Sequence, residues 1–150
     1  MMLLSRRSLL AIAAVVDIAL HARPLPVSAK SLAARHELPP RHLETMLQAL
    51  VHNGLLKGVR GPRGGYELAR ERRRITAGEI VRAAMNVIGD DDNSPEPQSK
   101  LVDGVVAPLV RNGTEQFLKA LDAVTVEDLC QEAEQKKVFE NSDQSVDFTI

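Results

Sequence analysis

The amino-acid sequence predicts a mainly α-helical fold that contains one small β-hairpin. Apolar residues recur at steps of three and four along most of the 150-residue chain, as they do on the buried face of a helix. Aromatic residues are few, with three Phe, one Tyr and no Trp, which favours an aliphatic core between helices. One segment breaks the helical pattern. Its sequence Arg-Gly-Pro-Arg-Gly-Gly, residues 60–65, predicts the tight tip of a hairpin.

Three helices are predicted ahead of this hairpin, over residues 5–21, 29–36 and 41–53. Pro24 cannot continue the first helix, and Ser28 is a good N-cap for the second. Pro40 suits the first turn of the third helix, and Gly54 ends it as a left-handed C′ residue would. Helix, short helix, turn, helix and hairpin is the element order of a winged helix-turn-helix, whose recognition helix enters the major groove of DNA.

Two sets of exposed side chains follow from this order. The third helix turns its apolar residues to the core and leaves a polar face with hydrogen-bond donors for base edges. The hairpin tip, or wing, combines glycines and a proline with two arginines, so it is both narrow and cationic. The candidate DNA-binding residues are Arg41, His42, Thr45 and Gln48 on the helix, and Arg60, Gly61, Pro62 and Arg63 on the wing.

Charge is distributed unevenly between the two halves of the chain. The whole chain has a net charge of −1. Residues 1–75 hold 13 Lys/Arg against 5 Asp/Glu, whereas residues 76–150 hold 6 against 15. The halves therefore carry +8 and −9, a split that indicates a polyanion-binding half joined to a half with another task. Solvated helix faces are the alternative explanation of these charges.

The chain is predicted to divide into four parts. Residues 1–86 form the winged helix-turn-helix domain, which closes with a helix opened by a capping box at residues 76–79. Residues 87–99 are acidic and rich in turn formers, which predicts a flexible loop. Residues 100–136 form a dimerisation helix and a short terminal helix, and residues 137–150 a disordered tail.

The dimerisation helix is predicted from a long apolar stripe. This stripe exceeds what the rest of the chain can cover, and helix-turn-helix proteins usually read palindromic sites as twofold dimers. Packing within the monomer is the alternative. Pro108 and the pair Asn112-Gly113 would each kink or weaken the helix, so its continuity is left open. The predicted interface residues are Leu101, Val105, Leu109, Phe117 and Leu121.

The amino terminus carries a pair of arginines ahead of an apolar run, as export signals do. The run from Leu9 to Val16 is only eight residues long before Asp17 interrupts it, which is too short to span a bilayer. Its apolar residues also recur at helical spacing. The sequence therefore favours a core helix of a cytoplasmic protein over an exported or membrane-tethered one.

Several of these segments together resemble one family of regulators. Residues 43–50, 53–55, 59–66 and 68–70 look like the Rrf-two (Rrf2) family, the IscR- and NsrR-type winged-helix repressors, and the likeness continues through residues 75–83 and 121–129. The resemblance implies a homodimer bound to double-stranded DNA. By position it makes Arg60, Gly61 and Pro62 minor-groove contacts, in keeping with the negative potential of a narrow groove. Arg41, His42 and Thr45 become the major-groove readers.

The chain departs from this family at its sensor. Cluster-binding members carry three cysteines in the loop before the long helix, whereas residues 87–99 contain none. The single cysteine, Cys130, lies downstream and permits neither an intramolecular disulfide nor a cysteine-only metal site within one chain. We therefore expect no iron–sulfur cluster and no other cofactor. The effector is left open between a small molecule, a partner protein and a redox event at Cys130.

The sequence predicts a sequence-specific transcriptional regulator, most simply a repressor. The alternative is a winged-helix protein-interaction module without DNA readout, which the acidic carboxyl half and the missing cysteines would suit. An enzyme is not expected, because the sequence has no recognisable nucleophile–base pair, phosphate loop or metal-ligand cluster.

Overall fold

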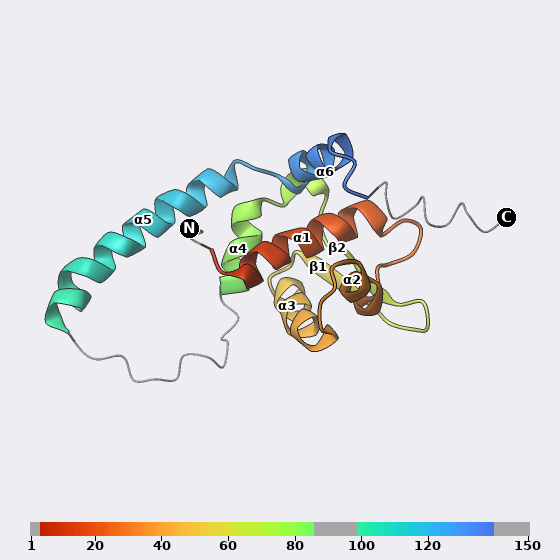
Figure 1. Cartoon of the computed structure of the whole chain (residues 1–150), viewed down its shortest axis with the longest axis horizontal. Coiled ribbons are helices and arrows are strands. Elements are labelled where there is room, and N and C mark those ends of the chain that lie inside the picture. Colours follow the sequence, from red (N-terminus) through yellow and green to blue (C-terminus); the bar gives the residue numbers. More distant parts are fainter. Residues whose placement is uncertain (1–3, 86–98, 140–150) are drawn as a thin grey trace.

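The computed structural model describes residues 4–85 and 99–139, and it confirms the predicted fold class (Figure 1). Within these residues, helices pack beside one two-stranded antiparallel hairpin. In chain order the elements are α1 (Arg6–His21), α2 (Ala29–Arg35), α3 (Pro40–His52), β1 (Leu56–Val59), β2 (Gly65–Leu68), the 3-10 turn η1 (Arg72–Arg74), α4 (Ala77–Met85), the π-helical turn η2 (Val102–Val106), α5 (Ala107–Asp122) and α6 (Val126–Gln135).

The helix boundaries follow from the capping residues that the sequence supplies. The hydroxyl oxygens of Ser5 and Ser28 accept hydrogen bonds from backbone N–H groups in the first turns of α1 and α2. Gly54 has a φ of +74° immediately after the C-cap of α3, as its predicted role requires. The capping box of α4 is also present, with Glu79 N donating to Thr76 Oγ1 over 3.2 Å.

The central element is α1, which packs against α3, α4, α6 and β2 (Figure 1). Its buried face includes Ala11, Val15 and Ile18, each with 0% of its surface exposed. The core around it is aliphatic, as the composition predicts, with Leu47 and Leu50 from α3 and Ile80 from α4. The segment that resembles an export signal is therefore the centre of the fold. In the described part of the chain, no helix has the length and apolar character needed to cross a membrane.

The long helix runs without a break from residue 100 to residue 122. Pro108 has no N–H to donate, and its ring would clash with the carbonyl four residues earlier in a regular α-helix. The widened turn η2 directly precedes Pro108, and the Ala107 N–H bonds to Val102 O, five residues back. Asn112 and Gly113 remain α-helical. The helix is therefore continuous, which the sequence left open, and a π turn accommodates Pro108.

The terminal helix α6 packs against α1, although the sequence groups it with the long helix. Val126 and Cys130 enter the same core as α1. The segment before α6 is tied to the segment before α4 by Ala77 N to Val124 O and Val126 N to Ile75 O, both 2.8 Å. Only the long helix stands away from the body (Figure 1). The predicted loop and tail lie outside the described residues, apart from residues 99 and 137–139.

Candidate nucleic-acid interface

The polar face of α3 is open to solvent, as the sequence predicts. Its opposite face is held in the core by Leu43, Met46, Leu47 and Leu50. Since these apolar residues follow the helical repeat, the remaining positions must point outward. The exposed residues include Arg41, Glu44, Thr45, Gln48 and His52. His42 belongs to the helix, and its side chain lies outside the described part.

The wing tip is exposed from Arg60 to Arg63 and partly covered at Gly64 and Gly65. All four predicted wing residues, Arg60, Gly61, Pro62 and Arg63, are solvent-exposed. Gly61 has a φ of +116°, a conformation that side chains disfavour, and its carbonyl accepts a hydrogen bond from Gly64 N over 2.9 Å. Among the described residues neither Arg60 nor Arg63 has an ion-pair partner. The tip therefore presents two uncompensated cations on a tight turn.

The hairpin is fixed against the start of α2. Val27 and Tyr66 form an antiparallel bridge, with Val27 N to Tyr66 O at 2.9 Å and Tyr66 N to Val27 O at 2.7 Å. At Gly65 the two backbones approach so closely that a Cβ would overlap the Val27 carbonyl. Glycine at this position thus allows the wing to dock on the helix-turn-helix. Figure 1 places the hairpin tip and α3 along the same lower edge of the molecule.

A buried ionic cluster sets α2 against α1. Asp17 is fully buried, and Arg35 donates from Nε to Oδ2 at 2.9 Å and from Nη2 to Oδ1 at 2.7 Å. His36 Nε2 lies 2.8 Å from Oδ2, and His21 Nδ1 lies 3.1 Å from Oδ1. Burial by itself would raise the pKa of Asp17. The hydrogen bonds and charge of Arg35, with His36 and His21, more than offset that effect and lower the pKa below 3.8.

We call these four residues the Asp17 cluster. The sequence analysis does not predict the cluster, because it treats Asp17 only as an interruption of an apolar run. The signal was nevertheless present, because a carboxylate at a core position of a helix needs a buried partner. Since Arg35 is 18 residues away, pattern analysis alone could not identify it. The cluster orients the first two helices and so positions the scaffold that carries α3.

A second ion pair joins the long helix to the rest of the fold. Arg82 in α4 donates to Asp122 at the end of α5, from Nη1 to Oδ1 at 2.6 Å and from Nη2 to Oδ2 at 3.0 Å. These hydrogen bonds lower the pKa of Asp122. Gly78 permits the approach, because a Cβ there would overlap Asp122 Oδ1. The carboxyl end of α5 is therefore held firmly on α4.

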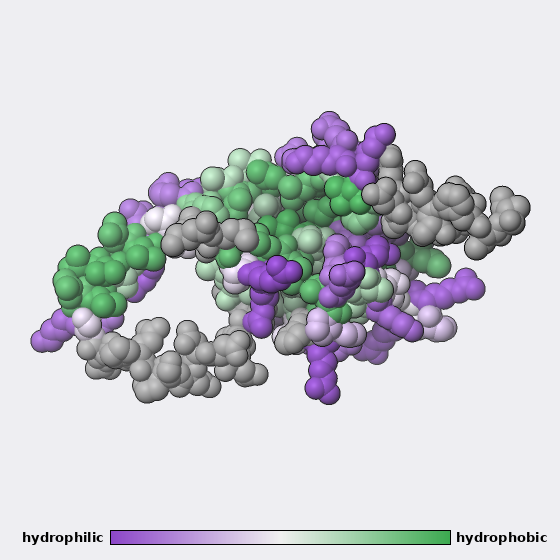
Figure 2. Space-filling model, in the orientation of Figure 1, coloured by the Kyte–Doolittle hydropathy of each residue, from purple (hydrophilic) through white to green (hydrophobic). Residues whose placement is uncertain are grey.

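The opposite end of the long helix presents an apolar stripe to solvent. Exposure reaches 65% at Leu101, 61% at Val105 and 70% at Leu109. Figure 2 shows this end as an apolar patch set apart from the body. Phe117 and Leu121 are half-buried, and Leu118 is buried. The predicted interface residues thus separate into a fully exposed group and a group that already contacts the body. The exposed stripe is completed by Val102, Val106 and Val110.

The only cysteine of the chain is buried in the core. Cys130 is 1% exposed in α6. Burial raises the pKa of its thiol above 9.0, Arg72 opposes the shift, and Glu127 and Glu134 add to it. A thiolate is the reactive form in redox chemistry, so this environment opposes reaction at Cys130. The redox event stays a hypothesis that the geometry does not favour.

Comparison with known proteins gives a consistent result. Residues 4–132 match the family model "Rrf2: Iron-dependent Transcriptional regulator". The chain is 33% identical over 132 residues to the putative HTH-type transcriptional regulator slr0846 of Synechocystis sp., covering 88% of this chain and 90% of that protein. It is 37% identical over 82 residues to the HTH-type transcriptional regulator IscR of Xenorhabdus nematophila, covering 55% of this chain and 50% of the relative.

Two solved structures have the same fold over nearly the whole chain. One is IscR of T. potens, with a TM-score of 0.65, 32% identity and coverage of 90% of both chains. The other is CymR (YrzC), the global cysteine regulator of B. subtilis, with a TM-score of 0.64, 27% identity and coverage of 88% of this chain and 98% of that one. These similarities confirm the predicted winged helix-turn-helix and the predicted resemblance.

The family description mentions iron, but neither the cysteine content of the sequence nor the described residues supply a set of iron ligands. A cluster held by cysteines needs several thiolates, and the sequence offers one, which is buried. Across residues 4–85 and 99–139, no group of three His, Cys, Asp or Glu side chains could hold a metal ion. His21 and His36 instead share Asp17 with an arginine, which is a structural arrangement.

Proposed function

The chain belongs to the Rrf2 family of HTH transcriptional regulators, and from this premise we propose that it is a homodimeric repressor that acts without an iron–sulfur cluster. The main support for the proposal is the wing. Arg60 and Arg63 are exposed and have no ion-pair partner among the described residues, so their positive charge is available to DNA. In this proposal α3 enters the major groove through Arg41, His42, Thr45 and Gln48, and the wing enters the adjacent minor groove. A repressor of this kind blocks transcription by occupying its operator.

The exposed apolar stripe over residues 101–110 of the long helix supports the homodimer. Monomeric proteins rarely leave so many neighbouring aliphatic side chains in water. A second copy of the chain would present the same stripe. Association of the two copies about a twofold axis would bury both stripes against each other. Two DNA-binding bodies related by such an axis would address two half-sites about one helical turn apart.

Steep salt dependence is the first expected result. Several arginines should neutralise phosphates, so affinity for operator DNA should fall at least about tenfold for a fourfold rise in salt. Selection of bound sequences from random DNA would supply the operator, and fluorescence anisotropy would then measure affinity across salt. Affinity that is undetectable or indifferent to salt would contradict the proposal and favour a winged-helix protein-interaction module.

Replacing Arg60 with Ala should weaken binding by about tenfold at operators with A·T-rich flanks. The loss should be smaller at G·C-rich flanks, because their wider minor groove concentrates less negative potential. Anisotropy titrations on the two kinds of operator would measure the difference. Arg111→Gln is the control, since it also removes one exposed positive charge but lies on α5, remote from the wing. Equal losses for the two variants would remove the wing from the interface.

A further inference from the structure

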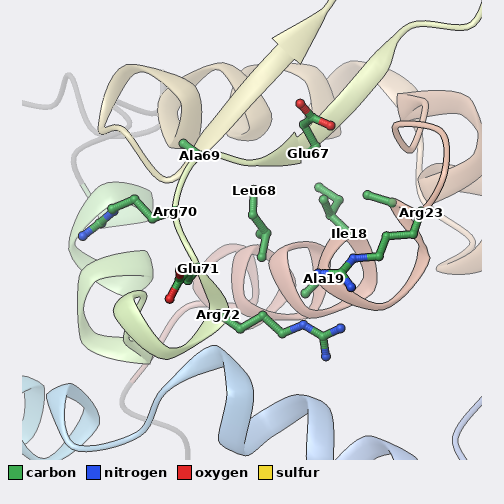
Figure 3. Close-up of a pocket in the computed structure, with 10 residues that line it drawn as sticks. Ile18, Ala19, Arg23, Glu67, Leu68, Ala69, Arg70, Glu71 and Arg72 are labelled. Atoms are coloured by element: carbon green, nitrogen blue, oxygen red, sulfur yellow. The ribbon is translucent and has the colours of Figure 1, made fainter.

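A cavity of about 330 Å³ lies between the carboxyl half of α1 and the segment that leads from β2 into η1 (Figure 3). Ile18, Ala19 and Ala22 contribute one apolar wall, and Leu68 contributes another. Arg23 and Arg72 stand at its rim. This volume is at the small end of the range for sites that bind small molecules.

Of the two arginines at the rim, Arg23 is unpaired among the described residues and Arg72 makes one long ion pair. Arg23 is exposed and has no ion-pair partner among the described residues. The nearest carboxylate oxygen to Arg72 is Glu127 Oε2, which is 3.9 Å from Arg72 Nε. Figure 3 shows both guanidinium groups on the α1 side of the cavity. A pair of cations over an apolar wall is suited to an anion with an apolar body.

The other charged residues of the cavity are directed elsewhere. Arg70 points away from it and pairs with Glu79 at 2.9 Å. Glu67 lies on the opposite side from Arg72 and pairs with Lys57 at 3.0 Å. Glu71 also turns outward. The positive charge of the cavity is therefore supplied by Arg23 and Arg72, which both line it.

We propose that this cavity binds a small organic carboxylate, its charge between Arg23 and Arg72 and its short apolar body against Ile18, Ala19 and Leu68. The site links α1 to β2, the second strand of the hairpin that carries the wing. Through Arg72 the site also approaches α6. A bound carboxylate would fix the base of the wing relative to α1. Ligand binding thereby controls operator affinity, a consequence that rests on the proposed function.

Benzoate is a suitable probe, because it combines one carboxylate with a compact apolar ring. Calorimetric titration into the full chain should give a dissociation constant in the millimolar range. Arg23→Gln should weaken binding at least about tenfold, since it removes a charge-assisted hydrogen bond from an exposed residue. Arg73→Gln is the matched control, because Arg73 is also an exposed arginine, adjacent to Arg72 in η1, but does not line the cavity. Its affinity for benzoate should stay within about twofold of the unaltered chain.

Three results would overturn the site. They are no heat of binding with benzoate, equal binding of uncharged benzamide, and equal losses in Arg23→Gln and Arg73→Gln. Inorganic phosphate has the negative charge but no apolar body, so its affinity tests the contribution of the apolar wall. If phosphate binds as tightly as benzoate, the cavity is a simple oxyanion site and the proposal is wrong.

Operator binding provides a separate measurement. Saturating benzoate should change operator affinity at least about twofold in the unaltered chain and not in Arg23→Gln. Benzoate binding without this change would overturn the regulatory role alone. A chain that binds benzoate but no DNA would instead contradict the proposed function.

Discussion

Replacing Asp17 with Asn is expected to lower the free energy of unfolding by about 2–4 kcal/mol. The carboxylate is fully buried and receives two hydrogen bonds from Arg35, with His36 and His21 beside it. The amide would keep the volume but would leave Arg35 without its counter-charge. Chemical denaturation followed by circular dichroism would measure the change. Asp103→Asn is the matched control, because Asp103 is exposed and makes no ion pair in the described part of the chain.

The same substitution should alter the response to acid. The pKa of Asp17 is lower in the folded chain than its ordinary value of 3.8, so its contribution to stability is fully present above that value. The contribution is lost as pH falls through the folded pKa. The stability gap between the native chain and Asp17→Asn should therefore be constant near neutral pH and narrow below about pH 4. The role given to the Asp17 cluster would be contradicted if the difference in stability between the two chains persisted at low pH. It would also be contradicted if Asp17→Asn lost no more stability than Asp103→Asn.

Replacing Leu109 with Asp should convert the dimer to a monomer and reduce operator affinity at least about 100-fold. In the single chain Leu109 is 70% exposed, so the substitution leaves the fold intact. In a dimer the substitution would bury an unpaired carboxylate within the apolar stripe. The free-energy penalty of removing this charge from water would exceed the stabilisation by the interface. Loss of the twofold arrangement would also remove simultaneous binding to two half-sites.

Light scattering coupled to size-exclusion chromatography would give the oligomeric state of Leu109→Asp, and circular dichroism would show that it is folded. Arg111→Gln again serves as the control, since it makes the same change in net charge two residues along the helix. A variant that remains dimeric would place the interface elsewhere. A monomeric variant with unaltered operator affinity would contradict the proposal that two half-sites are bound together.

Local patterns account for the parts of the fold that were predicted well. Ser28, Gly54 and the Thr76 capping box act over a few residues, so their consequences can be derived from sequence. The exposed face of α3 follows from helical periodicity in the same way. The sequence also predicts the family, because the wing residues between Val59 and Tyr66 carry a specific motif.

The features that the sequence does not predict depend on contacts between residues that are far apart in the chain. Nothing in the local pattern connects Asp17 to Arg35 or Arg82 to Asp122, which lie 18 and 40 residues apart. The return of α6 to α1 has the same cause, since an amphipathic helix does not specify its partner. The cavity beside β2 is lined by two segments that are far apart in the sequence, residues 18–23 and 67–72, and could be recognised only after the fold had brought them together.

The attachment of the long helix at one end has a mechanical consequence. The Arg82–Asp122 ion pair and the close approach at Gly78 act as a pivot, and the exposed stripe lies at the far end of the helix. The 16 residues of α5 make a lever arm of about 24 Å at 1.5 Å per residue. A tilt of about 5° at the pivot would move the far end by about 2 Å. Small changes in tilt at α4 would thus become larger displacements of the exposed stripe.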